Sequence, residues 1–519
     1  PALDIGIPVG KDSLSMHTSW DDAGETKSVT SPMSLVITAF APINDVTSHA
    51  TPQLSGNVGS PLFLLDLSAG KNRLGGSVYY QTQNQMGEES ADLDSPEQLK
   101  KMFALLQALH SQGDLLAYHD RSDGGLFATL SEMAFAGHCG LDVSLAQSNI
   151  EAQMFSEEPG AVLEVKPESL TAFHATVKKL GLEGCVSQVA VINGSKQINI
   201  NEQQVVWSLS ELEQLWSKAS YLMARHRDNP QSVDSEFALL NDDNPGIKPL
   251  AMFDYSKSQV KPYLKSDKPK LAVLREQGVN GQNEMAAAFM RAGFDCVDVH
   301  MSDLLSEKRH LSEFKGLVAC GGFSYGDVLG AGLGWAKTIL FNPKLKAQFK
   351  AFFADETTFA LGVCNGCQML SGLRSLIPGT AHWPDFVRNE SEQFEARFSQ
   401  LEIPAGNSMF FEGMAGAQIP VAIAHGEGRA DFGSRCVEPT TIAARYIDNH
   451  GQATQVYPYN PNGSSEAVAA VTSESGRVLA MMPHPERVFR TAQMSWAHEE
   501  WGENSPWMRM FYNARKFVG

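Results

Sequence analysis

The chain has 519 residues, 43% of them hydrophobic and 19% charged, with a net charge of −18. One hydrophobic core rarely extends over so long a chain, so we expect about two to four domains. The negative charge argues against nucleic acid or an anionic membrane as the main partner. Seven cysteines at these spacings do not form a disulfide framework and fit a reducing cytoplasm, where we expect the protein to be.

The first half of the chain mixes strand and helix patterns. Residues 2–16 read as the inside of a domain, so we expect the chain to be the C-terminal piece of a longer protein. Apolar residues spaced by three and four predict a helix from Leu99 to Leu109. The order of elements predicts an α+β fold. The other expected elements are strands at 33–42, 61–67, 115–118, 161–165 and 186–192, helices at 169–180 and from 126, and a hairpin strand at 198–207.

The second half has a different pattern. Between 227 and 268 the periodicity fades among prolines, which indicates a linker or wrapping segment. From Pro269 onward, apolar strand-like runs alternate with helical stretches, which predicts a parallel sheet with helices on both faces. Functional loops of such a sheet lie at the carboxyl ends of its strands. The expected strands are 270–274, 296–299, 317–320, 359–363 and 478–482.

Cys364 lies in the sequence Gly-Val-Cys-Asn-Gly at 362–366, which has the form of a nucleophile elbow between a strand and a helix. Far downstream, Pro483-His484-Pro485-Glu486 supplies a base and a carboxylate, the other parts of a covalent hydrolase. Taken alone, Cys364 and Cys367 are also compatible with a redox pair or half of a zinc site, and His484 with a surface turn. We interpret Cys367 as a small buried residue.

The C-terminal half resembles class I glutamine amidotransferase domains, which have a flavodoxin-like α/β fold and a Cys-His-Glu triad. The resemblance rests on 320–327, 362–368 and 484–486. It implies that Cys364 attacks glutamine, that His484 transfers the proton and that Glu486 orients the imidazole. It further implies an oxyanion hole made by backbone N–H groups. The other glutamine contacts it implies are Gly322, Phe323, Asn365 and Gln368.

Two further segments, 424–429 and 460–464, narrow the resemblance to the phosphoribosylformylglycinamidine synthase family of the large single-chain kind. That family places the loop with Asn462, Gly463 and Ser464 beside the glutamine site, and the segment 424–429 near the triad and the domain contact. Without the family, 460–464 reads as a polar turn and 424–429 as a solvated loop. The segments 404–409 and 432–439 look short and irregular compared with the family.

The first half resembles the second aminoimidazole-ribotide-synthase-like (PurM-like) unit of the same family. Asp120 then matches a Mg²⁺ ligand and Ser122 a nucleotide contact of a structural ADP site. From the residues alone, the favoured interpretation is that Asp123 caps the next helix. Lys11-Asp12-Ser13 reads as a surface turn, while the family places it by the synthetase cleft. The expected domains are the end of a PurM-like N-terminal domain at 1–45, a PurM-like C-terminal α+β domain at 46–207, a linker at 208–268 and the glutaminase at 269–519.

The resemblance implies an ATP-dependent glutamine amidotransferase, a carbon–nitrogen ligase of purine biosynthesis. Its partners would be glutamine, ATP with Mg²⁺, formylglycinamide ribonucleotide and the N-terminal remainder of the same enzyme, which we expect to be monomeric. Neither nucleic acid nor a membrane is expected as a partner. An ammonia path should join the two active sites. The rival hypotheses are the glutaminase of another ATP-dependent amidotransferase and a silent nucleotide-binding scaffold.

Overall fold

The computed structural model describes residues 2–11, 16–31, 35–202, 205–255 and 267–519. They divide into two compact units, the first ending at Ser217 and the second beginning at Lys218. Asp12 and Ser13 of the expected surface turn, and Met33 of the first expected strand, lie outside the described residues. Within the described part of the chain, no helix is both long and apolar enough to cross a membrane.

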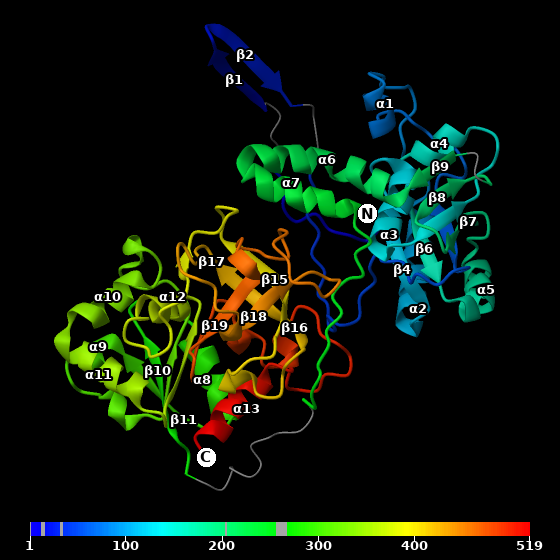
Figure 1. Cartoon of the computed structure of the whole chain (residues 1–519). Helices are drawn as coiled ribbons and strands as arrows, with labels where there is room; N and C mark the ends of the chain where they lie inside the picture. Colours follow the sequence, from blue (N-terminus) through cyan, green and yellow to red (C-terminus); the bar gives the residue numbers. More distant parts are fainter. Residues whose placement is uncertain (1, 12–15, 32–34, 203–204, 256–266) are drawn as a thin grey trace. The chain divides into compact units, whose positions relative to one another are not determined.

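The first unit is built around a sheet with the strand order β4-β6-β3-β7-β5-β8-β9 (Figure 1). Neighbouring strands are antiparallel except β5 and β8, which are parallel. This arrangement confirms the predicted α+β class, and β8 and β9 form the expected hairpin. The bounds are β3 Pro61–Asp66, β4 Leu115–Arg121, β5 Gly140–Val143, β6 Gly160–Val165, β7 Val186–Asn193, β8 Gln197–Ile200 and β9 Val205–Ser208.

Strand β3 is buried on both faces because helices cover the sheet from both sides. Its alternating residues divide between two cores: Leu62 and Leu64 face one, Phe63 and Leu65 the other. The first core is completed by α3, Gly125–Gly137, and the second by α2, Pro96–Gln112, and α5, Leu170–Leu180. The short helices α1, Val78–Thr82, and α4, Ile150–Phe155, complete the unit.

The N-terminal segment differs from the sequence prediction. Residues 35–42 form no strand, and their side chains are exposed. A strand needs a neighbour for its backbone hydrogen bonds, and none of the described strands pairs with this segment. Instead, β1, His17–Asp22, and β2, Glu25–Thr30, form an exposed antiparallel hairpin.

The segment 208–268, interpreted as a linker from its prolines, contains two helices. They are α6, Leu209–Arg227, and α7, Pro230–Ala238. The Asn229 side chain accepts hydrogen bonds from the N–H groups of Gln231 and Ser232, and Pro230 occupies the first helical position. Asn-Pro is therefore a helix start in this segment rather than a chain break.

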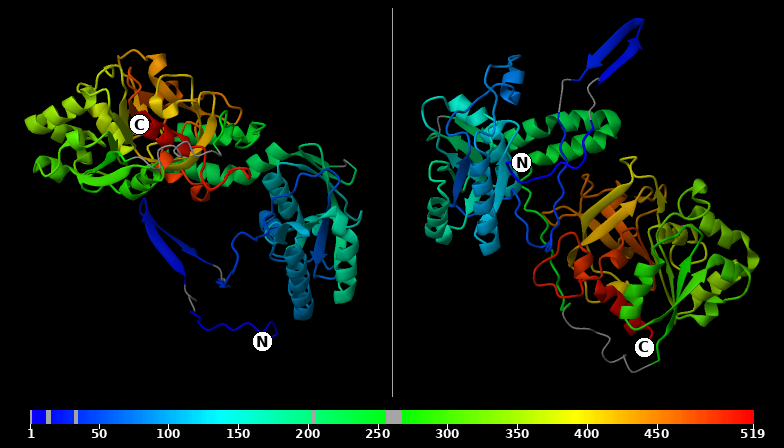
Figure 2. Two further views of the ribbon diagram at one scale, coloured as in Figure 1. Left: turned by 90° about the horizontal axis from the view of Figure 1, so that it is seen from below. Right: turned by 180° about the vertical axis from the view of Figure 1, so that it is seen from behind.

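The second unit, coloured from green to red in Figure 2, contains a mixed sheet. Its strand order is β11-β10-β12-β13-β20-β19-β18-β15-β16. The predicted parallel sheet is confirmed for β11 to β20, but the four remaining strands are antiparallel. The bounds are β10 Lys270–Arg275, β11 Asp295–His300, β12 Gly316–Ala319, β13 Phe359–Val363, β15 Glu395–Glu402, β16 Gln418–His425, β18 Ile442–Ile447, β19 Val468–Thr472 and β20 Val478–Met481. A small ladder joins β14, Asp385–Val387, to β17, Arg429–Asp431.

Helices cover both faces of the parallel strands, as expected of a flavodoxin-like domain. One face carries α8, Gln282–Arg291, and α13, Met508–Phe517. The other carries α9, Met301–Leu305, α10, Leu333–Phe341, α11, Pro343–Ala354, and α12, Asn365–Gly372. Because β10, β12, β13 and β20 are parallel, the loops that follow them meet at one edge of the sheet.

Candidate active site

Cys364 lies on the sharp turn between β13 and α12. Its backbone has φ 53° and ψ −110°, a strained conformation for a residue with a side chain. Glycines on both sides allow the turn: a Cβ on Gly362 would lie 2.4 Å from the carbonyl oxygen of Gly366, and one on Gly366 would lie 2.1 Å from that of Ala319. The Cys364 N–H donates to the Met481 carbonyl at 3.0 Å, which ties the turn to β20. The predicted nucleophile elbow is therefore present.

His484 and Glu486 form a buried pair after β20. Nδ1 of His484 lies 2.6 Å from Oε1 of Glu486, and both side chains are almost inaccessible to solvent. Among the described residues, Nε2 of His484 has no hydrogen-bond partner. The carboxylate therefore holds the proton on Nδ1 and leaves the other nitrogen available. The alternative interpretation of this segment as a surface turn is excluded, because both side chains are buried.

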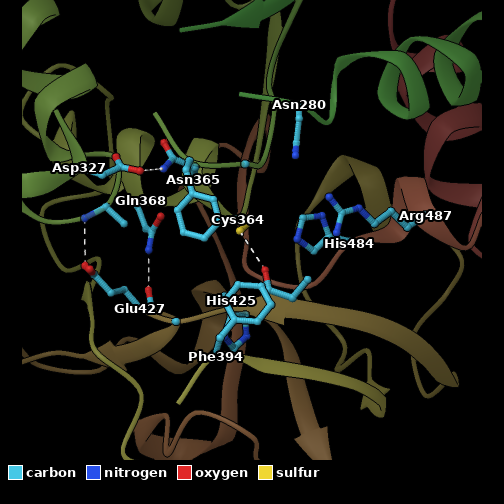
Figure 3. Close-up of a pocket in the computed structure, with 15 residues that line it drawn as sticks. Asn280, Asp327, Cys364, Asn365, Gln368, Phe394, His425, Glu427, His484 and Arg487 are labelled. Atoms are coloured by element: carbon cyan, nitrogen blue, oxygen red, sulfur yellow. Dashed lines mark hydrogen bonds between the residues drawn. The ribbon is translucent and has the colours of Figure 1, made fainter. Parts of the chain in front are cut away.

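Gly321, after β12, lies between Cys364 and His484. A Cβ at this position would be 2.7 Å from Cε1 of His484 and 3.1 Å from Cβ of Cys364. Only a residue without a side chain fits so close to both. Figure 3 shows the cysteine and histidine side chains facing one another across the cavity. The structure thus brings together the three residues that the sequence predicts as a triad.

Two buried histidines line this cavity with opposite electrostatic environments. Burial lowers the pKa of His484, but the charges of Glu486 and Cys364 outweigh it and raise the pKa to about 10. His425 lies without such a carboxylate, and burial together with the charge of His484 lowers its pKa to about 3. His484 therefore carries the proton at neutral pH, while His425 stays neutral.

The two cysteines of the elbow are also distinct. Cys367 is completely buried on the first turn of α12, and burial raises the pKa of its thiol well above the usual range. Cys364 is 7% exposed and lines the cavity. This fits the interpretation of Cys367 as a packing residue, since a buried neutral thiol is a poor nucleophile.

The cavity around Cys364 has a volume of about 220 Å³. It contains four predicted glutamine contacts: Gly322, Phe323, Asn365 and Gln368. Gly322 has φ 127°, and a Cβ there would lie 2.7 Å from the Asn280 nitrogen, so the loop requires glycine. The cavity is also lined by residues that were not predicted as contacts. Asn280 and Phe394 belong to none of the predicted motifs, whereas His425 and Glu427 belong to the segment 424–429, and Arg487 directly follows Glu486.

Asn462, Gly463 and Ser464 do not line this cavity. Asn462 and Ser464 are completely buried. The Asn462 side chain donates to the Gly428 carbonyl at 2.8 Å and accepts from the backbone and hydroxyl of Ser464 at 3.0 and 2.6 Å. The structure thus places the loop behind the cavity wall, where it supports the segment that follows β16.

The second predicted site lies in the first unit, between β4 and α3. Asp120 and Ser122 are exposed, and one oxygen of Asp120 accepts a hydrogen bond from the Tyr118 hydroxyl. The expected helix cap by Asp123 is wrong: the cap residue is Gly124, with φ 79° and no side-chain cap bond. The Gly124 N–H donates instead to Glu157 at 3.0 Å, because the glycine turn points it toward that carboxylate.

A magnesium site is not complete in the described residues. They contain no group of three or more His, Cys, Asp or Glu side chains placed to hold a metal ion. Asp120, the predicted ligand, is accompanied by Tyr118 rather than by a second carboxylate. Since Mg²⁺ binds through carboxylates and water in octahedral geometry, the residues present do not fit it by themselves.

Three family models match the chain in succession. Residues 268–518 match a CobB/CobQ-like glutamine amidotransferase domain. Residues 57–201 match the C-terminal domain of AIR synthase related proteins, and residues 1–42 match an FGAR-AT PurM_N-like domain. With the elbow and the buried histidine, the first match places the second unit among the glutamine amidotransferases.

Together, the three matched domains support a protein of the phosphoribosylformylglycinamidine synthase type. Its domains are those of an ATP-dependent glutamine amidotransferase of the carbon–nitrogen ligase class.

Similar solved structures overlap only parts of the chain. PurLQS from Thermotoga maritima is 24% identical, over 49% of this chain and 100% of that chain, with a TM-score of 0.38. A protein described as a GMP synthase component from Thermoplasma acidophilum is 14% identical, over 49% of this chain and 94% of that one, with a TM-score of 0.30. Thermotoga maritima PurL complexed with ATP is 12% identical, with a TM-score of 0.26; the match covers 36% of this chain and 28% of that PurL chain.

Proposed function

We propose that the second unit hydrolyses glutamine through a thioester on Cys364. The released ammonia would serve the ATP-dependent conversion of formylglycinamide ribonucleotide to formylglycinamidine ribonucleotide, a step of purine biosynthesis. The observation that carries the proposal is the strained elbow of Cys364 facing a histidine whose Nδ1 is 2.6 Å from a buried glutamate. Such an arrangement suits nucleophilic acyl transfer.

In this proposal His484 takes the proton of the Cys364 thiol, and the resulting thiolate attacks the side-chain amide carbon of glutamine. The imidazolium then gives its proton to the departing nitrogen, and ammonia leaves. Water, deprotonated by the same imidazole, cleaves the thioester to glutamate. The negative oxygen formed in both steps would be stabilised by the backbone N–H groups of Gly322 and Asn365, because both line the cavity.

The first unit would belong to the synthetase part of the same enzyme. Its match to AIR synthase related proteins supports a nucleotide-binding role, for which Asp120 and Ser122 are the proposed contacts. Mg²⁺ and ADP would require residues beyond those described, supplied by an N-terminal remainder. In this proposal the PurM-like C-terminal domain spans 46–207 and the glutaminase domain spans 269–519. The enzyme would act in the cytoplasm.

The nucleophile can be tested by labelling with a glutamine-mimicking electrophile. We expect one equivalent of label on Cys364 and none in Cys364→Ala. The matched control is Cys367→Ala, which removes the completely buried neighbouring thiol and should still be labelled. Label on Cys367 in the unmodified chain, or undiminished labelling of Cys364→Ala, would overturn the proposal.

The destination of the ammonia needs a second assay. In the complete enzyme, Cys364→Ala should abolish glutamine-dependent product formation but retain the activity supported by added ammonium salts. Added ammonia bypasses the thioester, so only the glutaminase step is lost. Loss of both activities, with folding intact, would contradict an ammonia-supplying role.

A further inference from the structure

The cavity wall contains a carboxylate without a cationic partner. Glu427, in the segment that follows β16, lines the cavity and is half-buried. Its Oε2 accepts one hydrogen bond, from the Ala331 N–H at 2.9 Å. Among the described residues, no Lys, Arg or His forms an ion pair with it. A negative charge on a partly desolvated wall is costly unless a positive group meets it.

The other acidic residue of the lining, Asp327, has a different environment. Its two oxygens accept hydrogen bonds from Ser324 and Gly332 on the same loop, so its charge is satisfied internally. Glu427 has only the bond from Ala331, which leaves the second oxygen for another donor. Of these two acids, Glu427 is therefore the one suited to a ligand.

Glu427 is also held firmly in place. Its carbonyl oxygen accepts a hydrogen bond from Nε2 of Gln368 at 2.5 Å, while its carboxylate is fixed by Ala331. Gln368 is buried on the first turns of α12, in the same helix that begins at Cys364. The acid is thus positioned relative to the nucleophile by both its backbone and its side chain, which lowers the entropy cost of binding.

The position of Glu427 relative to the triad indicates how glutamine would lie in the cavity. Figure 3 shows Glu427 and His484 on opposite sides of Cys364. An amide bound at the sulfur with its leaving nitrogen toward His484 would direct the rest of the molecule away from the imidazole. The far end of glutamine carries an ammonium group, and an ammonium removed from water needs a charged partner.

We propose that Glu427 binds the α-ammonium group of glutamine and so makes the cavity selective for the amino acid over simple amides. This inference rests on the proposed glutaminase function. Because a charge-assisted hydrogen bond is stronger than a neutral one, loss of the charge should weaken glutamine binding. Glu427 is a specificity residue in this scheme and takes no part in proton transfer.

The test compares Glu427→Gln with the unmodified chain on two substrates, glutamine and glutaramate, which lacks the α-ammonium group. We expect the KM for glutamine to rise about 10- to 100-fold with kcat little changed. The kcat/KM for glutaramate should stay within about threefold, because the analogue cannot use the carboxylate. Glu392→Gln, an exposed acid on the same unit, is the matched control and should leave both substrates unaffected.

Three outcomes would separate the explanations. Equal losses on glutamine and glutaramate would mean that Glu427 only braces the wall through Ala331, and the inference would fall. No loss on either would also overturn it. If the unmodified chain hydrolyses neither substrate and is not labelled at Cys364, the proposed function itself fails. If turnover is too slow to measure, Glu427→Gln and the unmodified chain can be compared by the rate at which Cys364 is labelled. The electrophiles would then be a pair with and without the ammonium group.

Discussion

The carboxylate of Asp327 accepts a hydrogen bond from the side-chain amide of Asn365, with Nδ2 at 2.9 Å from Oδ2. It also accepts bonds from the N–H and hydroxyl of Ser324, at 2.7 and 2.6 Å, and from the Gly332 N–H at 3.0 Å. These bonds join the loop after β12 to the residue that follows Cys364. The placement of Gly322 relative to the nucleophile therefore depends on Asp327.

Asp327→Asn should lower kcat for glutamine about 10- to 100-fold, since hydrogen bonds to a charged group are lost and an amide NH₂ meets existing donors. The KM should change less, because Asp327 acts on the oxyanion donors through Asn365 and the loop. Steady-state kinetics and the melting temperature check this together. Asp295→Asn, an exposed carboxylate at the start of β11, is the control. An unchanged kcat would show that the loop holds its position without the charge.

Gly321→Ala should abolish turnover although it adds a single methyl group. The new Cβ would lie 2.7 Å from Cε1 of His484, so the ring must move away from Glu486 or from the sulfur. Misplacement of a catalytic group by about 1 Å can cost about 100-fold in rate. The Cys364 labelling rate measures the effect. Gly406→Ala, where a Cβ meets nothing closer than 3.8 Å, is the matched control and should behave as the unmodified chain.

The pH dependence of Cys364 labelling should report the His484–Glu486 pair. Burial lowers the pKa of His484, while Glu486 and Cys364 raise it to about 10, so an imidazolium beside Cys364 persists through neutral pH. Glu486→Gln removes the largest raising influence. Its imidazole should lose the proton at lower pH, and labelling at pH 6 to 7 should fall. A rate–pH profile that superimposes on that of the unmodified chain would refute this account.

Much of the site could be read from local sequence, for a physical reason. Cys364 and His484 each follow a short apolar strand, and residues after parallel strands meet at one edge of the sheet. The strands themselves are buried on both faces and therefore stand out as continuous apolar runs.

The remaining features depended on contacts between distant segments. Asn462 belongs to a sequence that is typical of a polar turn, yet it is completely buried. Its side-chain amide donates a hydrogen bond to the Gly428 carbonyl, which belongs to a different connection between strands. The resemblance implied only that the segment 424–429 lies near the triad; that the Glu427 side chain lines the cavity follows from hydrogen bonds to Ala331 and Gln368. The antiparallel half of the sheet was missed for a similar reason: β15 pairs with β18, and β18 with β19, across long connections, and strand pairing is not encoded in local periodicity.

Asn462→Ala should destabilise the second unit rather than remove a substrate contact. The substitution leaves the Gly428 carbonyl and the Ser464 hydroxyl without the partners that now lie at 2.8 and 2.6 Å. Buried unsatisfied groups cost about 1–3 kcal/mol each, so we expect about 3 kcal/mol less stability in urea unfolding. Asn449→Ala, which alters a partly buried asparagine of the same unit, should cost less. An unchanged midpoint would contradict the assigned bracing role.

Glutamine hydrolysis by this chain alone should be slow, at least about tenfold below the rate with the synthetase part present, a difference of about 1.4 kcal/mol in barrier. The reason lies in the resting geometry: the Cys364 sulfur donates to the Ala424 carbonyl at 3.5 Å, and Nε2 of His484 has no hydrogen-bond partner among the described residues. A small displacement of the end of β16 would free the thiol for the imidazole. Glutamate release should therefore rise when the N-terminal part of the enzyme is added. Cys364→Ala should release no glutamate, either alone or with that part present. Full activity of the chain by itself would mean that the bond to Ala424 does not restrain the nucleophile.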